Sequence, residues 1–322
     1  MRIAIVVPCT ASKQWPVGGL RIAQVVGGET EVGERFRRWK AAVSQAGQVG
    51  VARNLYAGPR WQASMRIAVA ADGPRRDVDL FVASAGLGLI DADRLVPSYS
   101  ATFSRGSEDS VVAAGIKGRE RRDATQQWWK ALTRRGWSLR RLAQNYERVV
   151  IVLSPDYLDA VADDLGEAVD VGGSSVLIFG TGEPTDRALA PNWVRVGRHL
   201  RETTEERPDP VVNGLDATLL QSTAALVVRR TLNDWSSAWK VQRLLDRLAD
   251  PSEVTIEAMA RARRRPSTDE DICAFIRAQL ADAGRASADL LSVWRNVEER
   301  QCEEGRFKRL YAEVAEEGAR RG

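Results

Sequence analysis

The stretch SAGLGLIDADRLVPSYSATF, Ser84–Phe103, follows the apolar run Val78–Ala83 and decides how this chain folds. The N-terminus, MRIAIVVPCTASK, repeats the arrangement, because Ile3–Val7 leads into small and polar residues. Such β-branched runs are typical of buried strands in a parallel sheet, with loops at their carboxyl ends. Open α/β sheets bind their ligands at these ends. The two stretches therefore predict an α/β fold with a pocket for a flat, polar ligand.

The rest of the N-terminal part alternates between strand-like and helical patterns. Three more runs predict strands at Val149–Ser154, Ser175–Gly180 and Val194–Val196. Helical spacing of apolar residues predicts helices at Glu34–Ala46, Pro59–Ala71, Gln126–Arg135, Ser138–Asn145 and Pro155–Leu165. This alternation predicts a mostly parallel sheet with helices on both faces.

The pattern divides the chain into three parts. Residues 1–200 are expected to form the α/β domain, and residues 201–266, which open with RETTEERPDP, a helical connection. Three short helices follow in residues 267–322, and they resemble a helix-turn-helix module. Arg306, Lys308 and Arg309 on its last helix are then candidates for DNA contacts. The alternative is a packing domain with a solvated basic face.

Composition and charge bound the classes of function. The chain has 322 residues, 44% hydrophobic, with a formal net charge of +4. No apolar run reaches the roughly 18 residues of a membrane span, and the N-terminus makes a poor secretory signal, so we expect a cytoplasmic protein without membrane contact. Cys9, Cys273 and Cys302 lack disulfide or zinc spacing, and His199 is the sole histidine. We therefore expect no metal and no cofactor.

Small and polar residues after the strands are candidates for substrate binding. The loop after the first strand could hold an anion or the polar edge of a base through its backbone amides and Lys13. An aromatic ring in the pocket could stack on the ligand, although Tyr56 could also simply pack. The candidate binding residues are Cys9, Thr10, Ser12, Lys13, Tyr56, Ser84, Gly86, Tyr99, Gly180 and Thr181.

Two carboxylates, Asp91 and Asp93, are candidates for catalysis. They lie two residues apart, so on an extended segment both side chains share a face. Paired carboxylates suit metal binding, general acid–base catalysis or stabilisation of a positively charged sugar transition state. Helix capping and solvation are the alternative.

A basic stretch is a candidate nucleic-acid surface. Arg119, Arg121 and Arg122 are followed by Trp128 and Trp129, and further arginines come after them. Arginines interleaved with tryptophans fit phosphate contacts and stacking on bases. They fit equally an amphipathic helix that buries its tryptophans, and both interpretations stay open here.

Three segments carry a resemblance to a known family: CTASK at residues 9–13, NLYAGP at residues 54–59, and the stretch 84–103. Together they resemble the YaaA-like proteins and their uncharacterised relatives over about residues 1–103. The matching positions are Ser84, Ala85, Gly88, Leu89, Asp93, Tyr99 and Thr102. The departures are Gly86, where the family commonly has lysine, and Ser98 and Ser100, which replace its usual proline and aspartate.

The resemblance implies a function. The family is distantly similar to the uracil-DNA-glycosylase type of α/β sandwich, and relatives in phage defence include a glycosylase that removes glucosylated hydroxymethylcytosine. This implies base flipping on double-stranded, modified phage DNA and hydrolysis of the N-glycosidic bond to leave an abasic site. Asp93, and Asp91 after it, would then assist the reaction as carboxylates. The alternatives are a non-catalytic DNA-binding stress or defence protein and a nucleotide-processing N-glycosidase or transferase.

Overall fold

The computed structural model describes residues 1–196, 215–231, 238, 240–242, 267–283, 290, 291, 294 and 304–321. The chain divides into two compact units, one of Met1–Thr204 with Asp216–Leu248 and one of Glu205–Leu215 with Ala249–Gly322. No helix among the described residues is long and apolar enough to cross a membrane.

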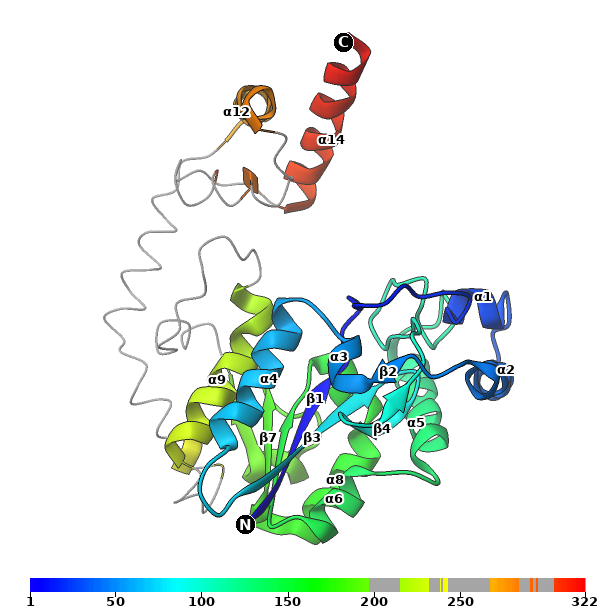
Figure 1. The fold of residues 1–322 in the computed structure, drawn as a ribbon, viewed down its shortest axis with the longest axis vertical. Helices are drawn as coiled ribbons and strands as arrows, with labels where there is room; N and C mark the ends of the chain where they lie inside the picture. Colours follow the sequence, from blue (N-terminus) through cyan, green and yellow to red (C-terminus); the bar gives the residue numbers. More distant parts are fainter. Residues whose placement is uncertain are drawn as a thin grey trace. The chain divides into compact units, whose positions relative to one another are not determined.

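A six-stranded sheet forms the centre of the first unit (Figure 1). Its order is β4 (Gly88–Asp91), β3 (Asp77–Ser84), β1 (Arg2–Pro8), β6 (Arg148–Val152), β7 (Val176–Gly180) and β8 (Trp193–Arg195). All neighbouring strands are parallel except β3 and β4. The predicted α/β fold with a mostly parallel sheet is therefore confirmed, and β1, whose residues Ile3–Val7 are buried, lies inside it.

Helices cover both faces of this sheet. The crossover from β1 to β3 carries α4 (Pro59–Ala71), while the segment between β3 and β6 carries α5 (Gly118–Thr133) and α6 (Leu139–Asn145). These two crossovers run in opposite directions along the sheet, so right-handed connections place their helices on opposite faces. Other helices that the structure describes there are α1 (Ile22–Val26), α2 (Val32–Gln45), α3 (Ala52–Leu55), α7 (Pro155–Ala160), α8 (Ala162–Gly172), η1 (Gly173–Ser175), η2 (Arg187–Asn192) and α9 (Leu215–Thr231).

The order of the strands creates a switch point between β1 and β6. From β1 the chain first moves to β3 on one side and later returns to β6 on the other. Parallel α/β sheets bind ligands outside the carboxyl ends of their strands at such a point. Cys9 follows β1, and Ser154–Tyr157 follow β6, so these residues lie at the switch point.

Strand β4 lies inside the stretch that the sequence predicts as one long loop. Gly88 has a φ of +79°, a value that favours glycine and lets the chain reverse after β3. Beyond this reversal β4 pairs antiparallel with β3, with Gly88 opposite Ser84 and Asp91 opposite Phe81. A second short ribbon pairs β2 (Gly50–Val51) with β5 (Leu95–Val96). The chain therefore leaves the carboxyl edge at Gly88.

The second unit contains α12 (Asp269–Ala283) and α14 (Glu304–Arg321). They pack around an apolar core that consists of Ile272, Ile276, Leu290, Leu291, Trp294, Phe307, Leu310 and Val314. The segments joining these helices lie outside the described residues, as do His199 and Cys302, so the helix-turn-helix arrangement stays a prediction.

Candidate functional site

Loops far apart in the sequence meet at the carboxyl edge of the sheet. The loop after β1 runs antiparallel to the segment after α3, because Lys13 bridges to Tyr56 and the Gln14 amide donates to the Leu55 carbonyl at 2.8 Å. The Thr10 hydroxyl donates to the carbonyl oxygens of Ser12 and Ala57 at 3.0 and 3.1 Å. These hydrogen bonds hold the two loops side by side.

Three buried hydroxyl groups form a hydrogen-bonded chain at this edge. The hydroxyls of Tyr56 and Tyr99 share a hydrogen bond of 2.9 Å, and Tyr99 shares another of 2.5 Å with Ser84. Tyr99 and Ser84 are fully buried, and Tyr56 almost so. Burial raises the pKa of Tyr56 and Tyr99 far above the ordinary phenol range, so both stay protonated at neutral pH.

Lys13 lies against this chain of hydroxyls. Its ammonium nitrogen is 4.9 Å from the ring centre of Tyr56 and 5.2 Å from that of Tyr99, and it donates to the Thr10 carbonyl. Desolvation lowers the pKa of Lys13, while the nearby Cys9 opposes this shift. Ring faces stabilise the charged form, so Lys13 combines a partly desolvated amine with a cation–π environment.

Cys9 and Tyr157 link the cluster to the switch point. The Cys9 thiol and the Tyr157 hydroxyl share a hydrogen bond of 3.0 Å, and the Tyr157 ring packs on Phe103 with 5.1 Å between ring centres. Burial raises the pKa of Tyr157 well above its usual value. We call Cys9, Lys13, Tyr56, Ser84, Tyr99 and Tyr157 the edge cluster.

The turn from Ser84 to Gly88 is held rigidly beside the edge cluster. The backbone amides of Gly86 and Leu87 donate to the hydroxyl oxygen of Ser84 at 3.2 and 2.9 Å. Trp128 donates its indole N–H to the Ala85 carbonyl, and Trp39 donates to the Gly86 carbonyl, both at 2.7 Å. A methyl group at Gly86 would lie 2.6 Å from the Tyr99 ring. Glycine is therefore needed here for close packing.

The edge cluster is closed to a bulky ligand in this structure. Its tyrosine side chains are buried, and their hydroxyls bond to one another and to neighbouring side chains. Ser12 is exposed and Lys13 is partly exposed, so solvent reaches the cluster from that side. On that side, the ammonium group of Lys13 can donate hydrogen bonds to an anionic or carbonyl group and attract it electrostatically.

Asp91 and Asp93 do not join the edge cluster. Asp91 lies three residues after Gly88 on β4, which runs away from the carboxyl edge of the sheet. This places it about 10 Å from the pair Ser84–Gly88 at the usual strand rise. Its carboxylate accepts the Asp93 amide at 2.7 Å. Asp93 is exposed and forms a bidentate ion pair with Arg53 at 2.5 and 2.6 Å. The catalytic role of these two residues stays a prediction without support from this geometry.

The candidates Gly180 and Thr181 lie at the carboxyl end of β7, next to β8. A methyl group at Gly180 would lie 2.1 Å from the Trp193 ring, so glycine lets that indole cover the end of β7. Trp193 donates its N–H to the Gly182 carbonyl at 2.9 Å. Thr181 is exposed. Among the described residues, no hydrogen bond or ion pair joins Gly180 or Thr181 to the edge cluster.

Most of the arginines expected to bind DNA have partners within the chain. Arg121 donates to the Phe103 carbonyl at 2.8 Å, and desolvation lowers its pKa. Arg119 lies 3.8 Å from the Asp123 carboxylate, and Arg122 is exposed. Arg306 pairs with Asp269 at 2.5 Å and Arg309 with Glu313 at 3.2 Å. The side chain of Lys308 lies outside the described part of the chain.

Comparison with known proteins adds no relative. No protein-family model, curated protein or solved structure matches this chain significantly. Among the residues that the structure describes, no group of three or more histidine, cysteine, aspartate or glutamate side chains is placed to hold a metal ion.

Sequence reasoning missed one member of the edge cluster and two tryptophans that hold the neighbouring turn. Tyr157 completes the edge cluster, while Trp39 and Trp128 hold the carbonyl oxygens of the Ser84–Gly88 turn. For Tyr157 the signal was its place directly after the third predicted strand. No local signal in the sequence marks Trp39 as a partner of Gly86, which lies 47 positions away.

Proposed function

We propose that this chain is a DNA glycosylase that receives a nucleobase beside the edge cluster, on the side of Ser12 and Lys13 that solvent reaches. One observation supports this proposal: loops from residues 9–13, 54–58, 84–88 and 99 meet where open α/β sheets bind ligands. The family resemblance of these same segments supplies the reaction, which is cleavage of the N-glycosidic bond.

The edge cluster is suited to stabilise the base as it leaves. When the glycosidic bond breaks, its electron pair moves to the base, and the sugar becomes positively charged. Preorganised donors that face the developing negative charge lower the barrier of such a step. Lys13 and the neighbouring hydroxyls are the donors available at this edge. A bound base would replace the Thr10 carbonyl as the partner of Lys13.

This proposal moves the main catalytic role from the carboxylates to Lys13. Asp93 is exposed and paired with Arg53, so nothing aligns it with a sugar at the edge cluster. We expect Lys13→Met to lower base release at least about 100-fold, the size of effect seen when one such donor is removed. Asp93→Asn should change base release less than about twofold. The exposed residue Lys130 gives the matched control Lys130→Met.

The experiment incubates the full chain with ordinary DNA and with DNA that contains glucosylated hydroxymethylcytosine. Released base and alkali-labile sites are scored together with DNA retention. Base release from either DNA that depends on Lys13 supports the proposal. Retention without any product would instead identify a DNA-binding protein without catalysis, and turnover of free nucleotides would identify a nucleotide-processing enzyme. Loss of activity in Asp93→Asn with full activity in Lys13→Met would return the catalytic role to the carboxylate.

A further inference from the structure

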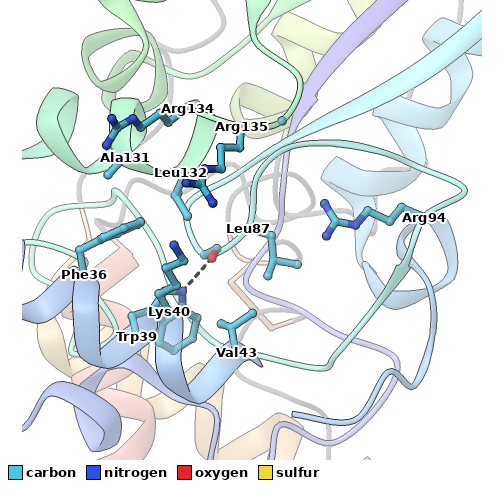
Figure 2. A pocket seen from close by; sticks show the side chains of 12 residues that line it. Phe36, Trp39, Lys40, Val43, Leu87, Arg94, Ala131, Leu132, Arg134 and Arg135 are labelled. Atoms are coloured by element: carbon cyan, nitrogen blue, oxygen red, sulfur yellow. Dashed lines mark hydrogen bonds between the residues drawn. The ribbon is translucent and has the colours of Figure 1, made fainter. Parts of the chain in front are cut away.

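A second site lies on the other side of the Ser84–Gly88 turn. It is a cavity of about 570 Å³, between α2, the turn itself and the carboxyl end of α5. Known small-molecule pockets fall between about 300 and 1,000 Å³, so the cavity is large enough for a nucleotide. Figure 2 shows the side chains that line it and the hydrogen bond from Trp39 to Gly86, which joins α2 to the turn. We call it the cationic pocket.

The charged side chains that line the cationic pocket all have the same sign. They are Lys40, Arg94, Arg134 and Arg135, and no carboxylate lines the cavity. The whole chain carries 47 basic and 43 acidic residues, so an average surface would mix the two signs. Like charges that gather without a counterion repel one another, and this arrangement favours an anionic ligand.

These four cations also lack partners in the described part of the chain. All four are exposed, and no ion pair or side-chain hydrogen bond is formed by any of them there. Other surface arginines do pair with carboxylates: Arg53 with Asp93, Arg140 with Glu167 and Arg195 with Glu183. The cationic pocket therefore holds charge that the fold itself leaves unneutralised.

The floor of the cationic pocket is apolar. Phe36, Val43, Leu87, Ala131 and Leu132 supply most of it. Trp39 lies fully buried behind this floor, and its indole N–H is already bonded to the Gly86 carbonyl. An apolar floor beneath a cationic rim fits a ligand with a flat, apolar part and separate negative charges, which is the chemistry of a nucleotide unit.

We infer that the cationic pocket binds a single-stranded segment of a polynucleotide, with one unstacked base on the floor and backbone phosphates on the rim. In Figure 2, Arg94 approaches Leu87 from one side, while Lys40 and Arg135 lie on the other. A strand carries a phosphate on each side of every base, whereas a free nucleotide carries its phosphates on one side. The flanking cations therefore favour the strand. This inference rests on charge and shape and does not require the excision reaction.

The test measures binding of a fluorescently labelled single-stranded oligonucleotide by anisotropy over a range of salt concentrations. The test variant Arg94→Ala/Arg135→Ala removes one cation from each side of the floor. The matched control Arg37→Ala/Arg195→Ala removes the same charge from two arginines outside the cavity, each paired with a carboxylate. Inorganic phosphate, a nucleoside triphosphate and duplex DNA serve as competitors.

We expect the test variant to bind at least about tenfold more weakly than the control. The slope of log affinity against log salt should become shallower by about 1.4, because each phosphate contact on a single strand contributes about 0.7. Equal affinity of the test variant and the control would overturn the inference. Displacement of the oligonucleotide by an equimolar nucleoside triphosphate would also overturn it, in favour of a free nucleotide. Both readouts are independent of base release, so either proposal can fail without the other.

Discussion

The two sides of the Ser84–Gly88 turn differ in whether their polar and charged side chains have partners. On one side, the polar groups of the edge cluster are buried and bonded to one another. On the other side, four cations surround an apolar floor with no acid among the lining residues. Trp39 connects the two, because it lines the cationic pocket while its ring lies 6.3 Å from that of Tyr99. The difference separates a cluster whose hydroxyl groups bond to one another from a cavity whose charged side chains have no partner in the described part of the chain.

The largest expected effect is that alkaline pH destabilises the fold through the buried tyrosines of the edge cluster. Burial raises the pKa of Tyr56, Tyr99 and Tyr157 above 10.0, so above this pH the unfolded chain releases protons that the folded chain retains. The unfolded state then binds fewer protons, and the free energy of unfolding falls by about 1.4 kcal/mol per tyrosine and pH unit. Lys13 acts in the opposite sense only up to 10.5, because its pKa is lowered.

The measurement is an ultraviolet titration of tyrosinate alongside circular dichroism. We expect these three tyrosines to ionise only as the fold is lost, in one steep transition well above pH 10. Smooth ionisation of all the tyrosines near pH 10 with the fold intact would show that the edge cluster is open to solvent.

The Gly86→Ala variant tests the shared wall between the two sites. The added methyl group would lie 2.6 Å from a Tyr99 ring carbon and 3.0 Å from Trp39, and neither buried ring has room to move. Overpacking of this kind costs about 1–3 kcal/mol, so we expect a loss of about 3 kcal/mol in chemical denaturation. Gly47→Ala is the control, because a methyl group there meets no atom within 4 Å. Equal midpoints for the two variants would contradict the close packing at Gly86.

Removal of cations from the open side should affect stability least. Arg134 and Arg135 are exposed and have no partners in the described part of the chain, so their removal costs no interaction and relieves repulsion. We expect Arg134→Ala/Arg135→Ala to change the free energy of unfolding by less than about 0.5 kcal/mol. Urea denaturation measures this change. A loss above 1 kcal/mol would mean that these arginines stabilise the fold, and the contrast between the two sides would disappear.

The sheet and most of its helices could be predicted from the sequence because their signals are local. Five apolar runs predicted β1, β3, β6, β7 and β8, and the helical patterns predicted α2, α4 and α6 within two residues at each end. The helix predicted at residues 155–165 is divided in the structure, because α7 ends at Ala160 and α8 begins at Ala162. The helix predicted from Gln126 already begins at Gly118.

The candidate carboxylates show where such local reasoning ends. Asp91 and Asp93 follow a glycine-containing segment that looks like a loop, and the sequence places them beside the other candidates. Whether the chain stays at the edge or reverses depends on strand pairing with β3, which is a long-range interaction. The reversal at Gly88 carries both carboxylates away, and Arg53 then pairs with Asp93.

The sequence by itself determined the five parallel strands and the small polar loops that follow them, because both depend on local hydrophobic patterns. It therefore brought Thr10, Lys13, Tyr56, Ser84 and Tyr99 toward one edge of the sheet. Only the tertiary structure decided that their hydroxyls close upon one another and that Lys40, Arg94 and Arg135 meet around one cavity. Such meetings depend on how helices and turns distant in the chain pack together, and no short stretch of sequence contains that information.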